Sequence, residues 1–495
     1  MTDDRRTLRR PSCRTRGFQI PLALLLLGPA LPAWGQSPGI GGPVAYAPLH
    51  GLFAASEGER RAAARALIES GDAALVPGLV DALFFLPGAR RAEAISALEA
   101  LTGERAGDRY HDWVELVARR PGLRPRKGYA DWKGELFARA DPRYREILRD
   151  GTPARLRLEE IVWGGVPLEG IPALDRPRTV PAAQAGYLED GEPVFGVSLR
   201  GEQRAYPLRI LGWHEMVNDE VGGEPVTLSY CTLCGSAVLF GTRRQGTAPF
   251  TFGTSGLLYR SNKLMVDRQT GTLWSNLTGE PVLGDVARDP EALPVLPLTR
   301  TTWKDWRTRH PGTTVLALDR QLAKRWGYDY TPGAADRKRR GVSFPGGPAG
   351  PDSAILDGKE EIFAVRLRHL AKAYPMDVVL REKVINDRLG ENDLVVVGDS
   401  QSGAVRAYRS GGRTFAPGAR PDELVDGSGV RWTAGEESLV PSGPEAFAPL
   451  ERIPGHQAFW FGWYSFFPGS ELYRGAGHDS KASAGEQHGH SRRLR

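Results

Sequence analysis

The fold is decided by residues 194–230, VFGVSLRGEQRAYPLRILGWHEMVNDEVGGEPVTLSY, which align with residues 362–398, IFAVRLRHLAKAYPMDVVLREKVINDRLGENDLVVVG. The alignment needs no gap and has a constant offset of 168 residues. It keeps an Ala-Tyr-Pro corner, an Asn-Asp pair and a glycine in step, and both copies end alike, in TTWKDWRTRHPG and AFWFGWYSFFPG. A repeat of this length predicts two similar lobes packed around a pseudo-twofold axis.

The pattern within and before the repeat predicts the fold class. Apolar runs of four to eight residues, separated by Gly, Pro and Asp turns, predict strands after Pro121. Before it, SGDAALVPGLVDAL and AEAISALEALTG resemble a HEAT-type helical pair with Gly71 and Gly103 as stops. We therefore expect an α+β protein, a mainly β duplicated two-lobed domain preceded by a small α-helical module. The predicted divisions are a signal peptide (1–35), a linker (36–58), a HEAT-like helical module (59–120), a first lobe (150–325), an inter-lobe connection (326–360), a second lobe (361–473) and a disordered tail (474–495).

The N-terminus predicts export. Six arginines precede an apolar run and a small-x-small cleavage site at Ala33-Trp34-Gly35, the pattern of a secretory signal peptide. Removing six Arg and two Asp with residues 1–35 lowers the 65 basic and 59 acidic residues to 59 and 57, so the net charge falls from +6 to +2. We expect a periplasmic or extracellular protein that binds no nucleic acid and meets a membrane only through an uncleaved leader.

The first lobe carries a cysteine pair that its copy lacks. Cys231 and Cys234 stand in TLSYCTLCGSAVLF, and the offset places Asp399 and Ser402 opposite them. His214 is also peculiar to the first lobe. Because the scaffold does not require cysteine at these positions, the pair is a specialisation of the first lobe.

Three roles for this pair stay open. GSAVLF reads as a strand, so Cys-x-x-Cys lies in a knuckle between two strands and lacks the helix N-terminus that activates thioredoxin-like thiols. The leading hypothesis is a copper or zinc site in which Cys231 and Cys234 supply thiolates and His214 or Met265 completes the ligand set. One alternative is a thiol-disulfide oxidoreductase, in which Cys231 attacks and Cys234 resolves. The other is a non-enzymatic scaffold, in which a disulfide between the two cysteines braces the protein and the helical module recruits a protein partner. Residues expected around the site, in a second shell or facing a substrate, are Glu215, Tyr259, Arg260, Asp267 and Trp274.

Five stretches in this order resemble one exported family of bacteria and archaea: GGVPLEGIPALDRPRTV, AYPLRILGWHEMVND, VTLSYCTLCGSAVLF, TFGTSGLLYRSNKLMVDRQTGTLWS and TTWKDWRTRHPGTTVL. That family is catalogued as domain of unknown function 3179, and the resemblance covers roughly residues 155–470. It implies an extracytoplasmic location and no particular substrate. Members often carry proline after the first cysteine, where this chain has Thr232. The resemblance also implies a site cluster of Cys231, Cys234, His214, Tyr259, Asp267 and Trp274.

Overall fold

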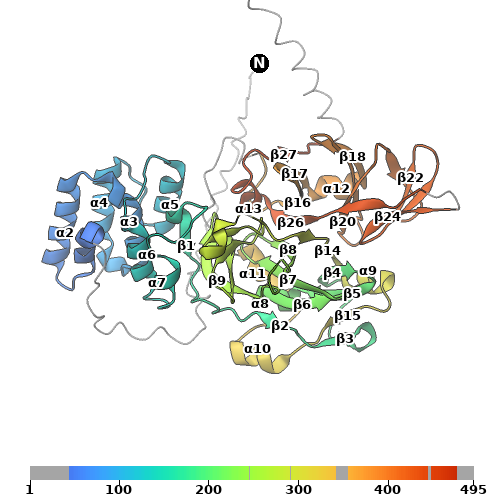
Figure 1. Cartoon of the computed structure of the whole chain (residues 1–495), viewed down its shortest axis with the longest axis horizontal. Helices are drawn as coiled ribbons and strands as arrows, with labels where there is room; N and C mark the ends of the chain where they lie inside the picture. Colours follow the sequence, from blue (N-terminus) through green and yellow to red (C-terminus); the bar gives the residue numbers. More distant parts are fainter. Residues whose placement is uncertain (1–43, 245, 290, 342–354, 444–446, 476–495) are drawn as a thin grey trace, which may run out of the picture.

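The computed structural model describes residues 44–244, 246–289, 291–341, 355–443 and 447–475. It confirms the predicted fold class, since helices come first and a mainly β region with several sheets follows. In Figure 1 the helices, in blue, lie at one end, and two β-rich lobes, green to yellow and orange to red, lie beside them. The predicted signal peptide and the tail from residue 476 fall outside the described residues. No helix in the described ranges is long and apolar enough to cross a membrane.

The helical module follows the start and stop signals of its sequence. Its elements are η2 (Val44–Tyr46), α1 (Ala47–His50), η3 (Gly51–Phe53), α2 (Glu57–Ser70), η4 (Ala73–Leu75), α3 (Val76–Phe85), η5 (Gly88–Arg90), α4 (Ala92–Thr102), α5 (Tyr110–Arg119), α6 (Tyr129–Phe137) and α7 (Tyr144–Ile147). The Ser56 side chain caps α2 by accepting a hydrogen bond from the Glu59 amide. Gly71 and Gly103 end α2 and α4 in the left-handed conformation, which glycine adopts without steric cost. Both predicted stops are therefore confirmed.

The module extends beyond the predicted range in both directions. Part of the predicted linker is helical and buries Tyr46 and Leu49 completely. Helices α6 and α7 follow Pro121, where the sequence analysis predicted strands, so that prediction is wrong for this segment. The reason is tertiary, because the ring of Trp132 on α6 stacks on Tyr46 with centroids 6.1 Å apart. Packing across the module thus overrides the weak local signal.

The helices share one hydrophobic core with a sheet of the first lobe. Leu79 and Leu83 on α3 belong to the same buried cluster as Leu257 and Leu264, which lie on strands of that lobe. The Tyr144 hydroxyl at the start of α7 also donates a 2.7 Å hydrogen bond to a backbone carbonyl of the lobe. The module is therefore a packed layer of the protein.

The described part of the first lobe contains three five-stranded sheets. One has the order β14 (Thr299–Thr302), β4 (Pro193–Leu199), β5 (Glu202–Pro207), β15 (Thr314–Leu316), β3 (Thr179–Pro181). The next has the order β13 (Val295–Leu296), β8 (Ser236–Gly241), β7 (Glu224–Cys231), β6 (Met216–Val221), β2 (Leu174–Asp175). The third, which meets the helical module, has the order β1 (Ile161–Trp163), β9 (Phe252–Tyr259), β10 (Asn262–Asp267), β11 (Leu273–Ser275), β12 (Pro281–Leu283). The helices are η6 (Leu158–Glu160), η7 (Ala182–Gln184), α8 (Leu208–His214), η8 (Asp285–Arg288), α9 (Trp303–Arg309), α10 (Arg320–Trp326) and α11 (Ala334–Gly341).

The second lobe repeats the first in a reduced form. Its smaller sheet has the order β26 (Gly455–Phe459), β16 (Glu361–Leu367), β17 (Leu370–Pro375), β27 (Glu471–Leu472). Its larger sheet has the order β18 (Val384–Leu389), β19 (Asn392–Gly398), β20 (Val405–Arg409), β25 (Leu450–Ile453), β24 (Ser438–Ser442), β23 (Arg431–Ala434), β22 (Glu423–Asp426), β21 (Phe415–Pro417). The helices are α12 (Met376–Glu382) and α13 (Trp460–Tyr464). Each lobe pairs its closing strand in parallel with the second strand of its first hairpin, β15 with β5 and β27 with β17.

The repeated residues make the same hydrogen bonds in both lobes. Asn218 donates to the carbonyl of Phe252 at 2.8 Å and accepts from its amide at 3.0 Å. Asn386 makes the same two bonds with Phe415, at 2.8 and 2.7 Å. In each copy the tyrosine of the Ala-Tyr-Pro corner donates a 2.8 Å bond to the aspartate of the Asn-Asp pair. Residues that repeat in the sequence are thus the ones that fix the shape of each lobe.

The connection between the lobes is folded where it is described. A run of basic residues is usually a solvated segment, but the run DRKRR within residues 326–360 lies in α11, which packs against α8. The side chain of Arg339 is only 3% exposed and pairs with Asp336 and Glu361, each at 2.7 Å. Two carboxylates compensate the cost of burying this guanidinium group. Helix α11 thereby brings basic side chains up to the first lobe.

Candidate functional site

The two cysteines lie in a tight connection between antiparallel strands. Cys231 is the last residue of β7 and pairs with Ser236, the first residue of β8. Gly235 has φ of +60° within the turn, a conformation that favours glycine. The strand that the sequence predicted after Cys234 is therefore confirmed, and neither thiol lies at a helix N-terminus. Both cysteines are free thiols in this structure.

The two thiols face different surroundings. Cys231 lines a cavity of about 180 Å³ between the helical module and the first lobe. Cys234 is fully buried, and its thiol donates a 2.7 Å hydrogen bond to the carbonyl of Ser261. The second lobe covers Cys234, since the Phe459 amide donates to its carbonyl at 2.7 Å and the backbone of Gly462 lies against its side chain. Only the first thiol is therefore open to a small molecule.

The thiols also differ in acidity. Burial raises the pKa of Cys231, but hydrogen bonds from the Cys234 side chain and from the backbone amides of Cys234 and Lys263 outweigh it and lower the net pKa. Burial raises the pKa of Cys234 well above its usual value, and the neighbouring Cys231 raises it further. The thiol that faces the cavity is therefore the one that ionises first.

A buried lysine and a glutamate stand beside Cys231. Burial lowers the pKa of Lys263 to about 8, and its Nζ donates to the backbone carbonyl of Glu215. The Glu215 carboxylate lies 4.0 Å from the same Nζ. Glu215 ends α8 with φ of +58°, and it lines the cavity together with Lys263. Lys338 on α11 adds a second amine, which donates to the carbonyl of Gly212 at 3.3 Å.

The rest of the cavity wall is mainly apolar. Phe84 comes from α3 of the helical module, and its ring meets Trp163 edge to face with centroids 5.5 Å apart. The Trp163 indole N–H donates to the carbonyl of Val166 at 2.7 Å, which closes the short loop after β1. Further lining residues are His111, Gly164, Gly165, Ile171, Thr232, Leu233, Thr254, Ser255, Gly256, Leu257, Leu258 and Leu264.

His214 and Met265, the predicted additional metal ligands, lie in other contacts. The Nδ1–H of His214 donates to the carbonyl of Pro172 at 2.8 Å, and the Tyr330 hydroxyl donates to Nε2. Burial lowers the pKa of His214 and keeps the ring neutral. Met265 belongs to a separate apolar cluster with Trp274. The described residues hold no group of three or more His, Cys, Asp or Glu side chains that would bind a metal ion.

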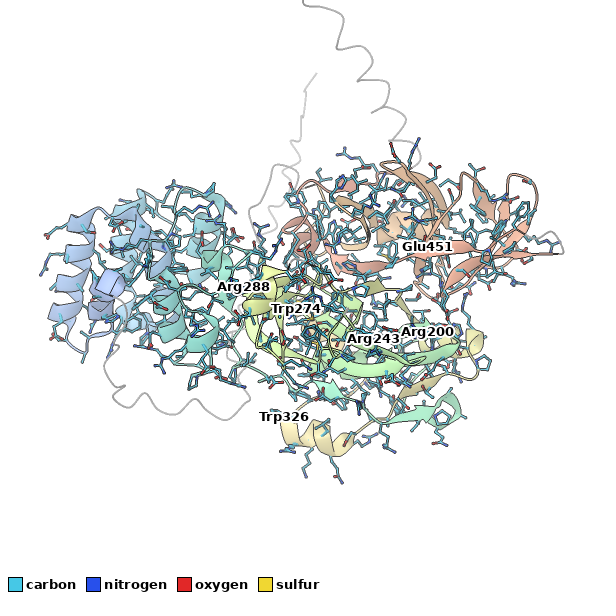
Figure 2. All side chains as sticks on the ribbon, viewed as in Figure 1. Arg200, Arg243, Trp274, Arg288, Trp326 and Glu451 are labelled. Carbon is cyan, nitrogen blue, oxygen red and sulfur yellow. The ribbon has the colours of Figure 1, made fainter. Side chains whose placement is uncertain are left out.

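The remaining predicted residues divide into two groups away from the cavity lining. Trp274 lies inside the first lobe (Figure 2), and its indole N–H donates to Asp267 at 2.8 Å. The second lobe has the same pair, in which the indole of Trp432 donates to its aspartate at 3.1 Å. Arg260 pairs with Glu160 at 2.6 Å, and its guanidinium lies 5.0 Å from the centroid of the Tyr259 ring. Of the five surrounding residues that we predicted, the structure brings Glu215 to the cavity that Cys231 lines.

Sequence reasoning missed Lys263 and Lys338. A signal for Lys263 was present, because NKLMVD places a lysine within an apolar strand, where a charged side chain requires a partner. Lys338 had no comparable signal, since DRKRR resembles any exposed basic run.

Fold and site together define a two-lobed β protein with a thiol pair, one member of which, Cys231, lines a cavity that a helical layer helps to enclose. Residues 168–470 match the family model described as protein of unknown function, DUF3179. Because this match covers more than half of the chain, the protein belongs to that family, as the resemblance predicted. No curated protein and no solved structure matches the chain.

Replacing Lys263 tests the charge beside Cys231. The pKa of Lys263 is about 8 in the folded protein and about 10.4 in the unfolded chain. Between these two values the Lys263 amine keeps its proton in the unfolded chain and loses it in the folded protein, so the free energy of unfolding rises with pH. We expect Lys263→Met to lose this rise, which amounts to about 3 kcal/mol, in unfolding experiments from pH 7.5 to 10.5. The variant should also raise the pKa of Cys231, followed by thiolate absorbance. Parallel stability curves for both proteins would contradict the assignment.

Proposed function

We propose that the protein is a thiol-based oxidoreductase in which Cys231 is the attacking thiol and Cys234 the resolving thiol. The observation that carries this proposal is the asymmetry of the pair. Cys231 lines the cavity and has the lowered pKa, while Cys234 lies behind it and has the raised pKa. A thiolate attacks a disulfide sulfur, and access together with thiolate fraction determines which thiol does so.

The environment supports each chemical step. The Cys231 thiolate attacks one sulfur of a substrate disulfide, and the other sulfur leaves as a thiolate. The Cys234 thiol then gives its proton to the departed substrate thiolate, attacks the Cys231 sulfur and expels the second substrate thiolate, leaving a Cys231–Cys234 disulfide, one substrate thiol and one substrate thiolate. Lys263 is suited to stabilise the Cys231 thiolate, because its amine is buried beside that sulfur and has a pKa of about 8.

The test is oxidation of the native, reduced protein. We expect a series of oxidised and reduced dithiothreitol mixtures to remove both thiols together, with a mass loss of two hydrogen atoms and a single midpoint potential. Cys234→Ser should instead accumulate a mixed disulfide at Cys231. The proposal fails if the native protein keeps both thiols under conditions where the urea-unfolded protein forms the disulfide.

A second candidate is a soft-metal site, favoured by the side-chain hydrogen bond that joins the two thiols. Copper(I) accepts two thiolates, and zinc needs further ligands. Cys231 and Cys234 would hold the metal, and the Lys263 ammonium would offset the negative charge. Elemental analysis of protein purified without chelators should then find about one equivalent of metal that Cys231→Ser/Cys234→Ser lacks. Equal metal contents in both proteins would contradict this candidate.

We also propose that the protein acts after export, in a compartment where disulfides persist. The predicted signal peptide carries this proposal.

Binding of a protein partner through the outer face of the helical module stays a prediction. The inner face of the module packs on the first lobe, which leaves the outer face available for such a partner.

A further inference from the structure

The cavity in front of Cys231 limits the size of any substrate. Its volume of about 180 Å³ is slightly larger than that of an engineered cavity that binds benzene, about 150 Å³. Phe84, Trp163, Leu257 and Leu258 supply apolar side chains to its lining. One ring or a short alkyl body, such as one half of a small disulfide, therefore fills this space and meets apolar surface on several sides, while the other half extends through the open side of the cavity.

The burial of Cys231 argues against a folded protein as the substrate. Cys231 is only 1% exposed, and a disulfide must approach the attacking sulfur closely to form a mixed disulfide. A disulfide within a folded protein carries two polypeptide segments with it, and a cavity of this size holds neither. The helical module adds a further obstacle, since Phe84 stands on the cavity wall.

The charges at the thiol end select for an anionic group. Lys263 and Lys338 place two amines on the lining, and Glu215 supplies one carboxylate. Glu215 lies 4.0 Å from the Lys263 amine. The Lys338 amine lies 4.6 Å from the centroid of the Trp213 ring and donates to a backbone carbonyl. Burial lowers the pKa of Lys338, and the nearby Glu215 carboxylate opposes this effect. Besides these three charged side chains and Cys231, the lining contains one more titratable side chain, His111. Burial lowers the pKa of His111 and favours its neutral ring. Lys338 is therefore the cation best placed to meet a ligand.

We propose that the substrate of the thiol site is a small disulfide with an apolar body and an anionic group, which Lys338 recognises. This inference rests on the proposed thiol function. In a single turnover the reduced protein supplies two electrons, the substrate disulfide bond breaks, and two small thiols form as the Cys231–Cys234 bond closes.

Four oxidants distinguish the outcomes: 4,4′-dithiodibenzoate, which is aromatic and anionic, 4,4′-dithiodianiline, which is aromatic and neutral, cystamine, which is aliphatic and cationic, and insulin, which is a protein disulfide. Each rate constant for oxidation of the reduced protein is divided by the rate constant of N-acetylcysteine with the same oxidant, which corrects for leaving-group reactivity. We expect the corrected rate for the anionic aromatic probe to exceed that of the neutral one by about tenfold. Cystamine should be slower still, and insulin should not react.

Two variants assign the selectivity to the cavity. Lys338→Met should lower the corrected rate for the anionic probe more than that for the neutral probe and so remove the preference between them, while Lys324→Met, at an exposed lysine on α10, should leave this preference as it is. Phe84→Ala should reduce the preference for aromatic over aliphatic probes. Corrected rates that are equal for all probes, or reaction with insulin, would overturn the substrate inference and leave the thiol function intact. If no probe oxidises the cysteines, the proposed function itself fails.

Discussion

Cys231→Ser is expected to lower the rate of native-state alkylation by N-ethylmaleimide by roughly 100-fold, because only Cys231 joins a lowered pKa to a place on the cavity wall. In the wild-type protein the reagent should modify Cys231 and spare Cys234. The measurement is the time course of adduct formation at pH 7, with the modified residue located by peptide mass spectrometry.

A matched pair of variants at Cys234 tests why Cys231 is acidic. The single S–H proton of Cys234 is shared between the Ser261 carbonyl and the Cys231 sulfur, and its hydrogen bond to Cys231 lowers the pKa of Cys231. The hydroxyl of Cys234→Ser can still donate this bond, and the methyl group of Cys234→Ala cannot. Cys231 should therefore react faster with N-ethylmaleimide in the serine variant than in the alanine variant at pH 7. Modification of Cys234 before Cys231 would contradict the assignment of roles.

The internal repeat made the β architecture predictable. Its matched positions turned out to be the structural ones, such as the asparagines that hold Phe252 and Phe415 by both backbone groups. The paired tryptophans that end the copies, for example Trp306 and Trp463, are fully buried. A duplicated sequence marks which residues a scaffold needs, because those are the residues that both copies keep.

The cavity was not predictable in the same way. Its wall combines Phe84, Trp163, Cys231 and Lys338, which come from four separate regions of the sequence. The sequence placed Phe84 within the helical module and Cys231 in a knuckle between two strands, but no spacing rule relates one to the other. The boundary after Pro121 failed for a similar reason, since α6 and α7 owe their stability to partners far along the chain.

The predicted metal ligands His214 and Met265 show a second reason why sequence alone was not sufficient. His214 and Met265 have the right chemistry for a soft metal, yet sequence alone does not say how a side chain is already used. The structure assigns both nitrogens of His214 to hydrogen bonds and places Met265 in an apolar cluster. The unpredicted neighbour of Cys231 is instead an amine, Lys263, which is why thiol chemistry now leads over metal binding among the proposals.

Gly462→Ala is expected to destabilise the protein by about 2 kcal/mol and to disturb the thiol pair from the side of the second lobe. A Cβ at this position would lie 2.8 Å from the Cβ of Cys234 and 3.1 Å from its sulfur. Cys234 is fully buried, so it cannot move away without shifting the turn or separating the lobes. Thermal unfolding should show the loss of stability.

The matched control is Gly469→Ala, in the segment that follows α13, where a Cβ would meet no atom within 4 Å. This variant should unfold like the wild type. Because Cys234 is the resolving thiol in the proposed reaction, Gly462→Ala should also slow closure of the Cys231–Cys234 disulfide and lengthen the life of the mixed disulfide at Cys231. A Gly462→Ala protein with unchanged stability and an unchanged closure rate would show that the second lobe does not hold Cys234 in place. Slower closure of the Cys231–Cys234 disulfide would instead mean that the second lobe contributes to the reaction, because its Gly462 leaves room for the resolving sulfur of Cys234.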